Sequence, residues 1–387
     1  MLNCISIYSL DAEKCFDRIW HSGLFYKLMD VIPVENWLLF YRWYNGLKAV
    51  VRWQGRYGQT FIVSRGTRQG SIVSPVFFNI FINDLLVSLS NEKYGLRIGP
   101  CSVNTIAYAD DITLLSTRIP DLQAMIDRCT SYAKEWRFVF SSSKSQCAIF
   151  GCNPFKDQIN FNLDGKDLHC TDRLEILGIT FHNSGTSSCH VTKRTQKCRR
   201  TAYTLSPSGM CYPGVQTKVK THVWQTVCLP TLLYGIDILN ISSTDMSSLE
   251  TTQGTILKQW LGLSKRQHHT TLLKALGLPT IKQAMREKMS HLYYRLFQED
   301  TPARRLNIRW LSKYMTSGRC PKESLLSRIL SMGCNPLEIM TRIPKKSGIP
   351  STKDGVIDSL SYLLHSENFT KPWSLEHALV TLLTKAF

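Results

Sequence analysis

The sequence is short of acidic residues and lacks several patterns that define whole classes of protein. Its 29 Asp and Glu residues stand against 47 Lys and Arg residues, which gives a formal net charge of +18 at pH 7. No apolar run approaches the length of about 20 residues that a membrane-spanning helix needs, so no membrane partner is expected. The 13 cysteines include no C-x-x-C pair, which disfavours a secreted disulfide framework and the usual zinc-ligand spacings.

The chain does contain a large apolar fraction and a strong excess of positive charge. Hydrophobic residues make up 43% of its 387 residues and charged residues only 20%, so it can bury a sizeable core. Its length favours two or three domains, or one large domain with an appendage. The basic balance indicates a polyanionic partner, most often nucleic acid. We interpret the protein as intracellular, with reduced thiols.

The order of hydrophobic patterns predicts an α+β fold. An alternating strand ends at Asp11, and a long amphipathic helix begins at Ser74-Pro75, where the hydroxyl would cap the helix. Turn residues predict hairpins at Gln54-Gly55 and Asp164-Gly165 and a further one at Ala109-Asp110-Asp111. The predicted ranges are 18–29, 35–47 and 121–136 for helices, 49–63 and 102–115 for hairpins, and 161–181 for short strands.

Composition changes near residue 183, where the small and polar run HNSGTSSCH leads into basic, helix-like sequence. We therefore predict three regions, 1–182, 183–270 and 271–387. The first would be an antiparallel sheet backed by helices, the second an α-rich basic region and the third a helical region of unknown role. Five cations between Lys193 and Arg200 would form a solvated helix face or would contact nucleic-acid phosphates.

Two adjacent carboxylates, Asp110 and Asp111, carry the clearest chemical signal. They lie between two apolar strands, and adjacent side chains on a strand point to opposite faces, so both can converge only at a turn. Like charges at one turn repel unless a cation neutralises them, although an ordinary polar turn would show the same letters. Asp11 ends a separate apolar strand. Three carboxylates on neighbouring strand ends suit a pair of Mg²⁺ ions about 3.5–4 Å apart.

Four runs extend this pattern: SLDAEKCFDRIWH, GTRQGSIVSPVFFNIFIND, IAYADDITLLS and LEILGITF. Together, in this order and spacing, they resemble the reverse transcriptases of non-LTR (LINE-type) retrotransposons. The resemblance covers about residues 1–182 and extends more loosely through CLPTLLYGIDIL. It implies a polymerase palm followed by a thumb-like region, with Asp11, Asp110 and Asp111 as the catalytic carboxylates that hold two Mg²⁺ ions, for which Mn²⁺ could substitute.

The resemblance also assigns binding roles. Phe16 matches the aromatic gate that excludes a ribonucleotide, and Arg68, Gln69 and Gly70 match the motif whose glutamine lies against the incoming nucleotide. Lys144 matches the lysine proposed to protonate pyrophosphate, although RFVFSSSKS departs from the family's usual run before it. Leu177 and Gly178 fall in the hairpin that grips the primer.

The implied partners are an RNA template, a DNA primer and deoxynucleoside triphosphates, and the family's mode of action implies the nucleus. Only ten residues precede Asp11, so we expect the family's fingers segment and its endonuclease to be missing, as in a truncated copy. An inactive nucleic-acid-binding remnant is the alternative reading. A group II intron maturase, which shares the YADD box, is the third, and SPVFFNIFIND favours the LINE-type family over it.

Overall fold

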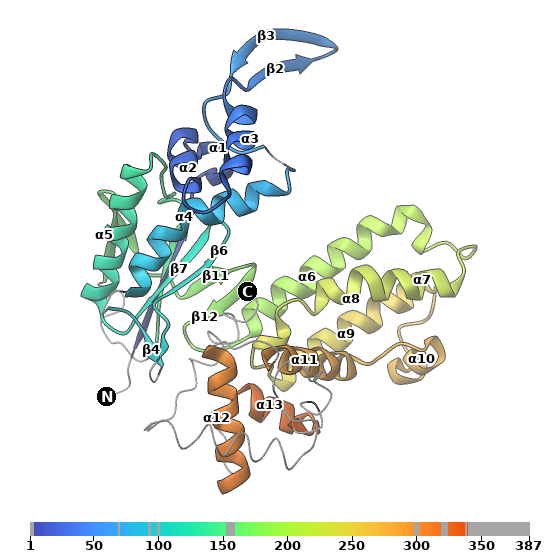
Figure 1. Ribbon diagram of the computed structural model, residues 1–387. Helices are drawn as coiled ribbons and strands as arrows, with labels where there is room; N and C mark the ends of the chain where they lie inside the picture. Colours follow the sequence, from blue (N-terminus) through green and yellow to red (C-terminus); the bar gives the residue numbers. More distant parts are fainter. Residues whose placement is uncertain are drawn as a thin grey trace. The chain divides into compact units, whose positions relative to one another are not determined.

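The computed structural model describes residues 4–68, 70–91, 94–98, 101–151, 159–297, 302–318, 324–336 and 339. The chain divides into two compact units, Met1–Leu177 and Gly178–Phe387, which we call the N-terminal and C-terminal units. The first contains the main sheet and the second is α-rich (Figure 1). The predicted α+β class is confirmed. The three-region division with a boundary after residue 182 stays a prediction.

A four-stranded antiparallel sheet forms the centre of the N-terminal unit. Its strand order is β6-β7-β1-β8, so the first strand of the chain is an inner strand between β7 and β8. This inner position explains why β1 is buried on both faces, although the alternation of its apolar residues predicts burial of one face only. The strands are β1 Ile5–Asp11, β6 Thr105–Tyr108, β7 Asp111–Ser116 and β8 Gln146–Phe150.

Helices pack on this sheet and complete one core. Tyr8 and Leu10 of β1 and Leu114 of β7 share a buried cluster with Phe81 of α4 and Ile126 of α5. The predicted sheet backed by helices is therefore present. The helices of this unit are α1 Cys15–Arg18, α2 His21–Leu28, α3 Val34–Tyr44, α4 Val73–Asn91 and α5 Ile119–Glu135.

The described residues also form short two-stranded hairpins. Gln54 and Gly55 both have positive φ and turn the chain between β2 and β3, and Asp164 and Gly165 do the same between β9 and β10. These turns are the ones that the sequence predicted. The remaining strands are β2 Lys48–Trp53, β3 Arg56–Ile62, β4 Arg97–Ile98, β5 Cys101–Ser102, β9 Asn160–Leu163, β10 Lys166–His169, β11 Arg173–Ile176 and β12 Ile179–His182.

Two helix predictions in this unit are wrong in detail. The helix expected over 18–29 is broken, because Trp20 is extended and bridges Arg65 between α1 and α2. Ser74 does not cap α4, which already begins at Val73; its hydroxyl instead donates to the carbonyl of Arg68 at 2.7 Å. Long-range contacts, which local patterns do not report, decide both cases.

Helix α4 also corrects the expectation about apolar runs. Its window Val73–Ser90 has a mean hydropathy of 1.5 and is long and apolar enough to cross a membrane by length and composition. Of this window 39% is buried, and Val76 and Val87 are exposed. Six apolar side chains of α4 lie in the core of the N-terminal unit. They are Phe77, Phe78, Phe81, Ile82, Leu85 and Leu89.

The C-terminal unit has its own core, built around Trp224 and Trp260. Helix α6 Ser188–Leu205 packs on α8 Leu229–Leu232 and on α9 Ser243–Trp260. A short 3₁₀ turn, η4 Ile236–Ile238, lies in the connection between α8 and α9. The other helices are η2 Ser206–Met210 and η3 Trp224–Cys228, which are π-helical, α7 Thr217–Val223, α10 His269–Leu276, α11 Ile281–Leu296, α12 Pro302–Ser317 and α13 Leu325–Ser331.

Candidate active site

Two of the predicted carboxylates lie directly opposite each other at one end of the sheet. Asp11 is the last residue of β1 and pairs in register with Asp111, the first residue of β7. Residues opposite each other in an antiparallel pair have Cβ atoms about 4.5–5.5 Å apart. Hydrogen bonding between the two strands therefore sets the separation of the Cβ atoms of these two residues.

The third carboxylate, Asp110, lies in the tight turn between β6 and β7. Because Tyr108 pairs with Asp111, only Ala109 and Asp110 form the loop, and Ala109 adopts a φ of 50°, which is uncommon for a residue other than glycine. The Asp110 carbonyl accepts a hydrogen bond from the Ala12 amide at 3.3 Å. This bond ties the turn to the residue that follows Asp11, so the structure brings all three predicted carboxylates to one end of the sheet.

Negative charge accumulates at this end of the sheet. Burial raises the pKa of Asp111, the nearby carboxylates of Asp110 and Asp11 raise it further, and only Lys144 acts in the opposite direction. Burial, followed by Asp110, also raises the pKa of the Cys15 thiol to about 12. These shifts are those expected where like charges converge in a partly desolvated place.

Lys144 supplies the positive charge at the site. Its Nζ atom lies 3.3 Å from Oδ2 of Asp11, and its side chain is 65% exposed. That Oδ2 atom is buried and accepts no hydrogen bond, so the ion pair is its polar contact. The loop that carries Lys144 is fixed to the end of β1, because the Ser141 amide donates to the Asp11 carbonyl at 2.8 Å and the Asp11 amide lies 3.4 Å from Ser145 Oγ.

The donor set suits a hard divalent cation. Carboxylate oxygens are the ligands that Mg²⁺ prefers, and a buried carboxylate oxygen without a hydrogen bond is an available ligand atom. Across the part of the chain that the structure describes, no group of three His, Cys, Asp or Glu side chains is already gathered to hold a metal. The backbone thus brings the three aspartates to one end of the sheet, and the side chain of Asp11 pairs with Lys144 there.

Phe16 lies on α1, five residues after Asp11, and is half-buried against the ring of Phe78 at 5.3 Å. Its carbonyl accepts a hydrogen bond from the Thr67 amide at 2.7 Å. This bond places Phe16 beside the segment that contains Arg68. The structure therefore joins two predicted nucleotide-binding segments that lie about 50 residues apart in the sequence.

Arg68 is exposed and its guanidinium lies 4.5 Å from the ring centre of Trp43. Gly70 has a φ of 80°, a conformation that glycine adopts without strain, and has open space around it. Gln69 lies outside the described residues. The predicted roles of this motif remain predictions.

The Leu177-Gly178 pair forms the tight turn between β11 and β12, and both residues have positive φ, 50° and 72°. A Cβ atom at Gly178 would lie 3.7 Å from the ring of Tyr234, which is ordinary contact distance. The ring of Tyr234 therefore packs beside the predicted primer-gripping turn, a feature that the sequence reasoning did not identify.

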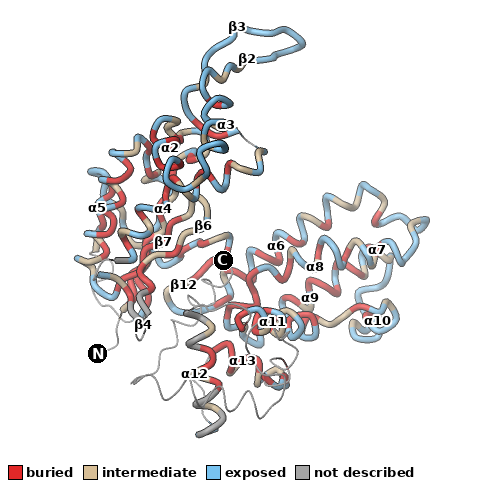
Figure 2. Tube along the Cα trace, viewed as in Figure 1, coloured by how far each residue is buried: buried red, intermediate tan, exposed pale blue. Residues whose placement is uncertain are grey.

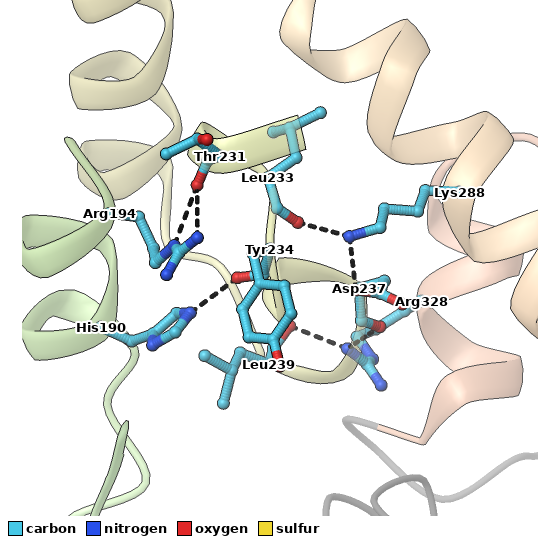
Figure 3. Close-up of polar contacts among 9 residues, drawn as sticks. All are labelled: His190, Arg194, Thr231, Leu233, Tyr234, Asp237, Leu239, Lys288 and Arg328. Carbon is cyan, nitrogen blue, oxygen red and sulfur yellow. Dashed lines mark hydrogen bonds and ion pairs between the residues drawn. The ribbon is translucent and has the colours of Figure 1, made fainter. Parts of the chain in front are cut away.

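The backbone around Tyr234 is held by two side chains of α6 (Figure 3). His190 is fully buried; its Nε2 donates to the Tyr234 carbonyl at 2.8 Å, while its Nδ1 accepts from the Thr180 amide. Arg194 donates twice to the Thr231 carbonyl, at 2.7 and 3.0 Å, and its guanidinium lies 4.7 Å from the Tyr234 ring centre. One cation of the Lys193–Arg200 cluster is therefore structural. In the sequence, only its membership of this basic cluster distinguished Arg194, and that membership did not indicate a structural role.

The following residues are held from the other side by α11 and α13. Lys288 donates to the Leu233 carbonyl at 2.6 Å and pairs with the buried carboxylate of Asp237 at 3.2 Å. Arg328 donates to the carbonyls of Asp237 and Leu239 at 3.1 and 2.8 Å. Helices from both sides thus fix this loop, as Figure 3 shows.

Comparison with known proteins identifies one matching family and several relatives of this chain. Residues 3–181 match the family described as reverse transcriptase (RNA-dependent DNA polymerase). The chain is 25% identical over 307 residues to the RNA-directed DNA polymerase from mobile element jockey of Drosophila funebris, covering 77% of this chain and 33% of that protein. It is 26% identical over 242 residues to the Retrovirus-related Pol polyprotein from type-1 retrotransposable element R2 of Popillia japonica, covering 60% and 38%.

The chain therefore spans about a third of the length of these curated relatives. Among solved structures, telomerase from Candida tropicalis in complex with the TWJ fragment of telomeric RNA is similar with a TM-score of 0.40 and 11% sequence identity. That match covers 94% of this chain and 50% of the telomerase chain.

Proposed function

Since residues 3–181 belong to the reverse transcriptase family, and the chain's relatives are enzymes of non-LTR (LINE-type) retrotransposons, we propose that this chain carries the catalytic centre of an RNA-directed DNA polymerase. The observation that supports it most directly is the register of β1 and β7, which sets Asp11 opposite Asp111 with Asp110 on the adjoining turn. Its substrates would be deoxynucleoside triphosphates and the 3′ end of a DNA primer paired with an RNA template.

In this proposal Asp11, Asp110 and Asp111 hold two Mg²⁺ ions, or Mn²⁺ in their place. When bound, such ions neutralise charge on the attacking and leaving oxygens of a phosphoryl transfer. The chain's own contribution is the fixed spacing of the ligands and a buried Asp11 oxygen that lacks a hydrogen bond. Binding of a cation by Asp11 would release Lys144, whose exposed ammonium could then give a proton to the departing pyrophosphate.

The remaining predicted residues complete the substrate site. Arg68, Gln69 and Gly70 would lie along the incoming nucleotide, and the Leu177-Gly178 turn would contact the primer strand. The product would serve integration of a retrotransposon, so we expect the protein to act in the nucleus. An inactive remnant that binds nucleic acid is the second candidate, favoured by the chain's net charge of +18.

Metal binding and primer extension test the proposal at two levels. Asp110→Asn should abolish binding of Mn²⁺, followed by its electron paramagnetic resonance signal, because it removes one of three charged ligands. It should lower primer extension on an RNA template by about a thousandfold, since a lost metal ligand costs several kcal/mol of transition-state stabilisation. Asp30→Asn, which changes an exposed carboxylate after α2, is the matched control.

The outcomes separate the two candidates. Extension by the wild type that Asp110→Asn removes and Asp30→Asn retains would support the polymerase. Binding of an RNA–DNA hybrid without extension would support the remnant. Extension that survives Asp110→Asn would exclude this centre.

Phe16 tests the proposed choice of sugar. Phe16→Val should raise incorporation of ribonucleotides relative to deoxyribonucleotides, because the volume of the ring is the barrier to a 2′-hydroxyl. We expect the ratio of kcat/KM values for the two sugars to shift by about tenfold or more. An unchanged ratio would leave Phe16 as a core residue packed on Phe78.

A further inference from the structure

The hairpin β2–β3 is the most exposed regular structure in the N-terminal unit. Every residue of β3 is exposed, and of β2 only Ala49 is partly covered. Within the described part of the chain, the hairpin pairs with no other strand. It extends away from the helices of its unit (Figure 1), with exposed surface along its whole length (Figure 2). An isolated hairpin is marginally stable in water, and only Ala49 of these two strands is partly covered by the rest of the chain.

Large aromatic rings project from this hairpin into solvent. Trp53 is 74% exposed, Tyr57 67% and Phe61 51%. The register of the hairpin shifts between Val50 and Arg52, so Tyr57, which is opposite Arg52, and Phe61, which is opposite Ala49, lie on opposite faces. Phe61 shares its face with Trp53, which lies four residues from Ala49 on β2. Arg52 is the cross-strand partner of Tyr57, with its guanidinium 5.5 Å from the ring centre, and Trp53 is opposite Arg56. Two of the three rings, those of Tyr57 and Trp53, thus have an arginine as their cross-strand neighbour.

The charge of the surrounding sequence is entirely positive. Between Glu35 and Asp84 there is no acidic residue, and the six charged residues are Arg42, Lys48, Arg52, Arg56, Arg65 and Arg68. In a protein, strand-edge cations oppose pairing with another strand, and a second copy of this hairpin would carry the same charge. A polyanion, by contrast, is attracted to it.

We propose that the β2–β3 hairpin is a binding platform for single-stranded nucleic acid, with bases stacked on the exposed rings of both its faces, Trp53 and Phe61 on one and Tyr57 on the other, and phosphates contacted by Arg52 and Arg56. Exposed rings combined with cations are the features that bind single strands without sequence preference, because every base has a flat face that can stack. A base paired within a duplex does not offer that face. The inference does not depend on the carboxylate site, since stacking needs no divalent metal.

Binding should be measured on the full chain in EDTA, which removes the proposed catalytic metals. The probes are fluorescein-labelled oligonucleotides of about 16 nucleotides, oligo(U), oligo(dT) and a mixed-sequence duplex, followed by fluorescence anisotropy at several salt concentrations. Comparing oligo(U) with oligo(dT) distinguishes RNA from DNA as the preferred strand. The duplex tests whether the platform is selective for single strands.

Two double variants separate stacking from charge. Tyr57→Ala with Phe61→Ala should weaken single-strand binding by about ten- to a hundredfold and leave the salt dependence unchanged. Arg52→Ala with Arg56→Ala should flatten the slope of log K against log salt by about 1.4, since each phosphate contact on a single strand contributes about 0.7. The charge-matched control is Arg118→Ala with Lys134→Ala, two exposed cations that pair with Asp121 and Asp164.

Other outcomes would overturn the proposal. Single-strand affinity unchanged in both hairpin variants, or an equal loss in the charge-matched control, would show that other cations bind the strand. An equal loss of duplex binding in the stacking variant would contradict selectivity for single strands. A wild type that is dimeric by light scattering, with a hairpin variant that is monomeric and binds normally, would make a second copy the occupant. Far-ultraviolet circular dichroism confirms that each variant folds.

Discussion

The carboxylate end of the sheet in the N-terminal unit and the loop between α8 and α9 in the C-terminal unit differ in how their buried charges are paired. At the sheet end of the N-terminal unit, three carboxylates converge, Asp111 has a raised pKa and an Asp11 oxygen is buried without a hydrogen bond. At the loop between α8 and α9 of the C-terminal unit, the buried carboxylate of Asp237 pairs with Lys288, and Arg328 of α13 donates to the carbonyls of Asp237 and Leu239. The first arrangement lowers stability and leaves ligand atoms available, and the second fixes a loop.

This difference separates buried polar groups that stabilise a loop from buried polar groups that are available to bind a ligand. Satisfied polar groups in a low-dielectric interior hold a backbone in one arrangement, and unsatisfied ones are costly unless a ligand completes them. The C-terminal loop is held by side chains of α6, α11 and α13. At the carboxylate end of the sheet three carboxylates converge and Lys144 pairs with Asp11, and this excess of like charge is the physical reason for proposing a cation site there.

The largest expected effect on folding comes from Arg328. Replacing Arg328 with Met keeps most of the volume but leaves the buried carbonyls of Asp237 and Leu239 without these donors. We expect a loss of about 3 kcal/mol in the free energy of unfolding, since each unsatisfied buried acceptor costs about 1–3 kcal/mol. Urea unfolding, followed by circular dichroism, measures it.

Lys27→Met in the N-terminal unit is the matched comparison. Lys27 is also buried, and contacts Asp84, the Phe81 carbonyl and the Tyr132 hydroxyl. Its partners have alternatives, however, because Asp84 is 56% exposed and Tyr132 already donates to the Phe81 carbonyl. Exchange for a similar apolar side chain should then cost less than about 1 kcal/mol. Equal losses in the two variants would contradict the distinction between the units.

A smaller effect, opposite in sign, is expected at Asp111. Burial and the neighbouring carboxylates raise its pKa in the folded state, so the folded chain binds this proton more readily than the unfolded chain does. The cost of ionising Asp111 is absent at pH values below the unfolded pKa and grows as the pH rises through the raised folded pKa. In EDTA at neutral pH, Asp111→Asn should therefore stabilise the protein by up to about 1 kcal/mol.

The pH dependence is the diagnostic measurement for that variant. The advantage of Asp111→Asn should disappear at low pH, where the wild-type carboxyl is already neutral. Adding Mn²⁺ at neutral pH should stabilise the wild type more than the variant, because the cation relieves the same repulsion. A stability difference that is constant with pH would contradict this assignment.

Local chemistry made much of the fold predictable. The Gln54-Gly55 and Asp164-Gly165 pairs have the backbone conformations that their residue types favour, and both turns lie where the sequence placed them. The start of α9 also follows local chemistry, because the Ser242 side chain accepts a capping hydrogen bond from the Asp245 amide. The strand end at Asp11 and the turn at Asp110 and Asp111 were also read from hydrophobic alternation, whereas the assignment of the three carboxylates to one site came from the resemblance to reverse transcriptases.

Contacts between distant segments were not predictable in the same way. Nothing near Arg328 in the sequence indicates that it donates to carbonyls about 90 positions away. Arg194 looked like a member of a phosphate-binding cluster, because five neighbouring cations give no sign of which one turns inward. The break at Trp20 depends on a bridge to Arg65. Propensity describes one segment at a time, and these features arise from pairs of segments.

The pairing of Asp11 with Asp111 has a consequence for tolerance to sequence change. The distance between their backbones is set by interstrand hydrogen bonds, whose spacing is common to all antiparallel sheets. It therefore does not depend on which apolar side chains fill the core behind the two strands. A chain can drift widely in its interior packing, gain or lose volume there, and still present these two carboxylates at the same separation for as long as β1 and β7 remain in register.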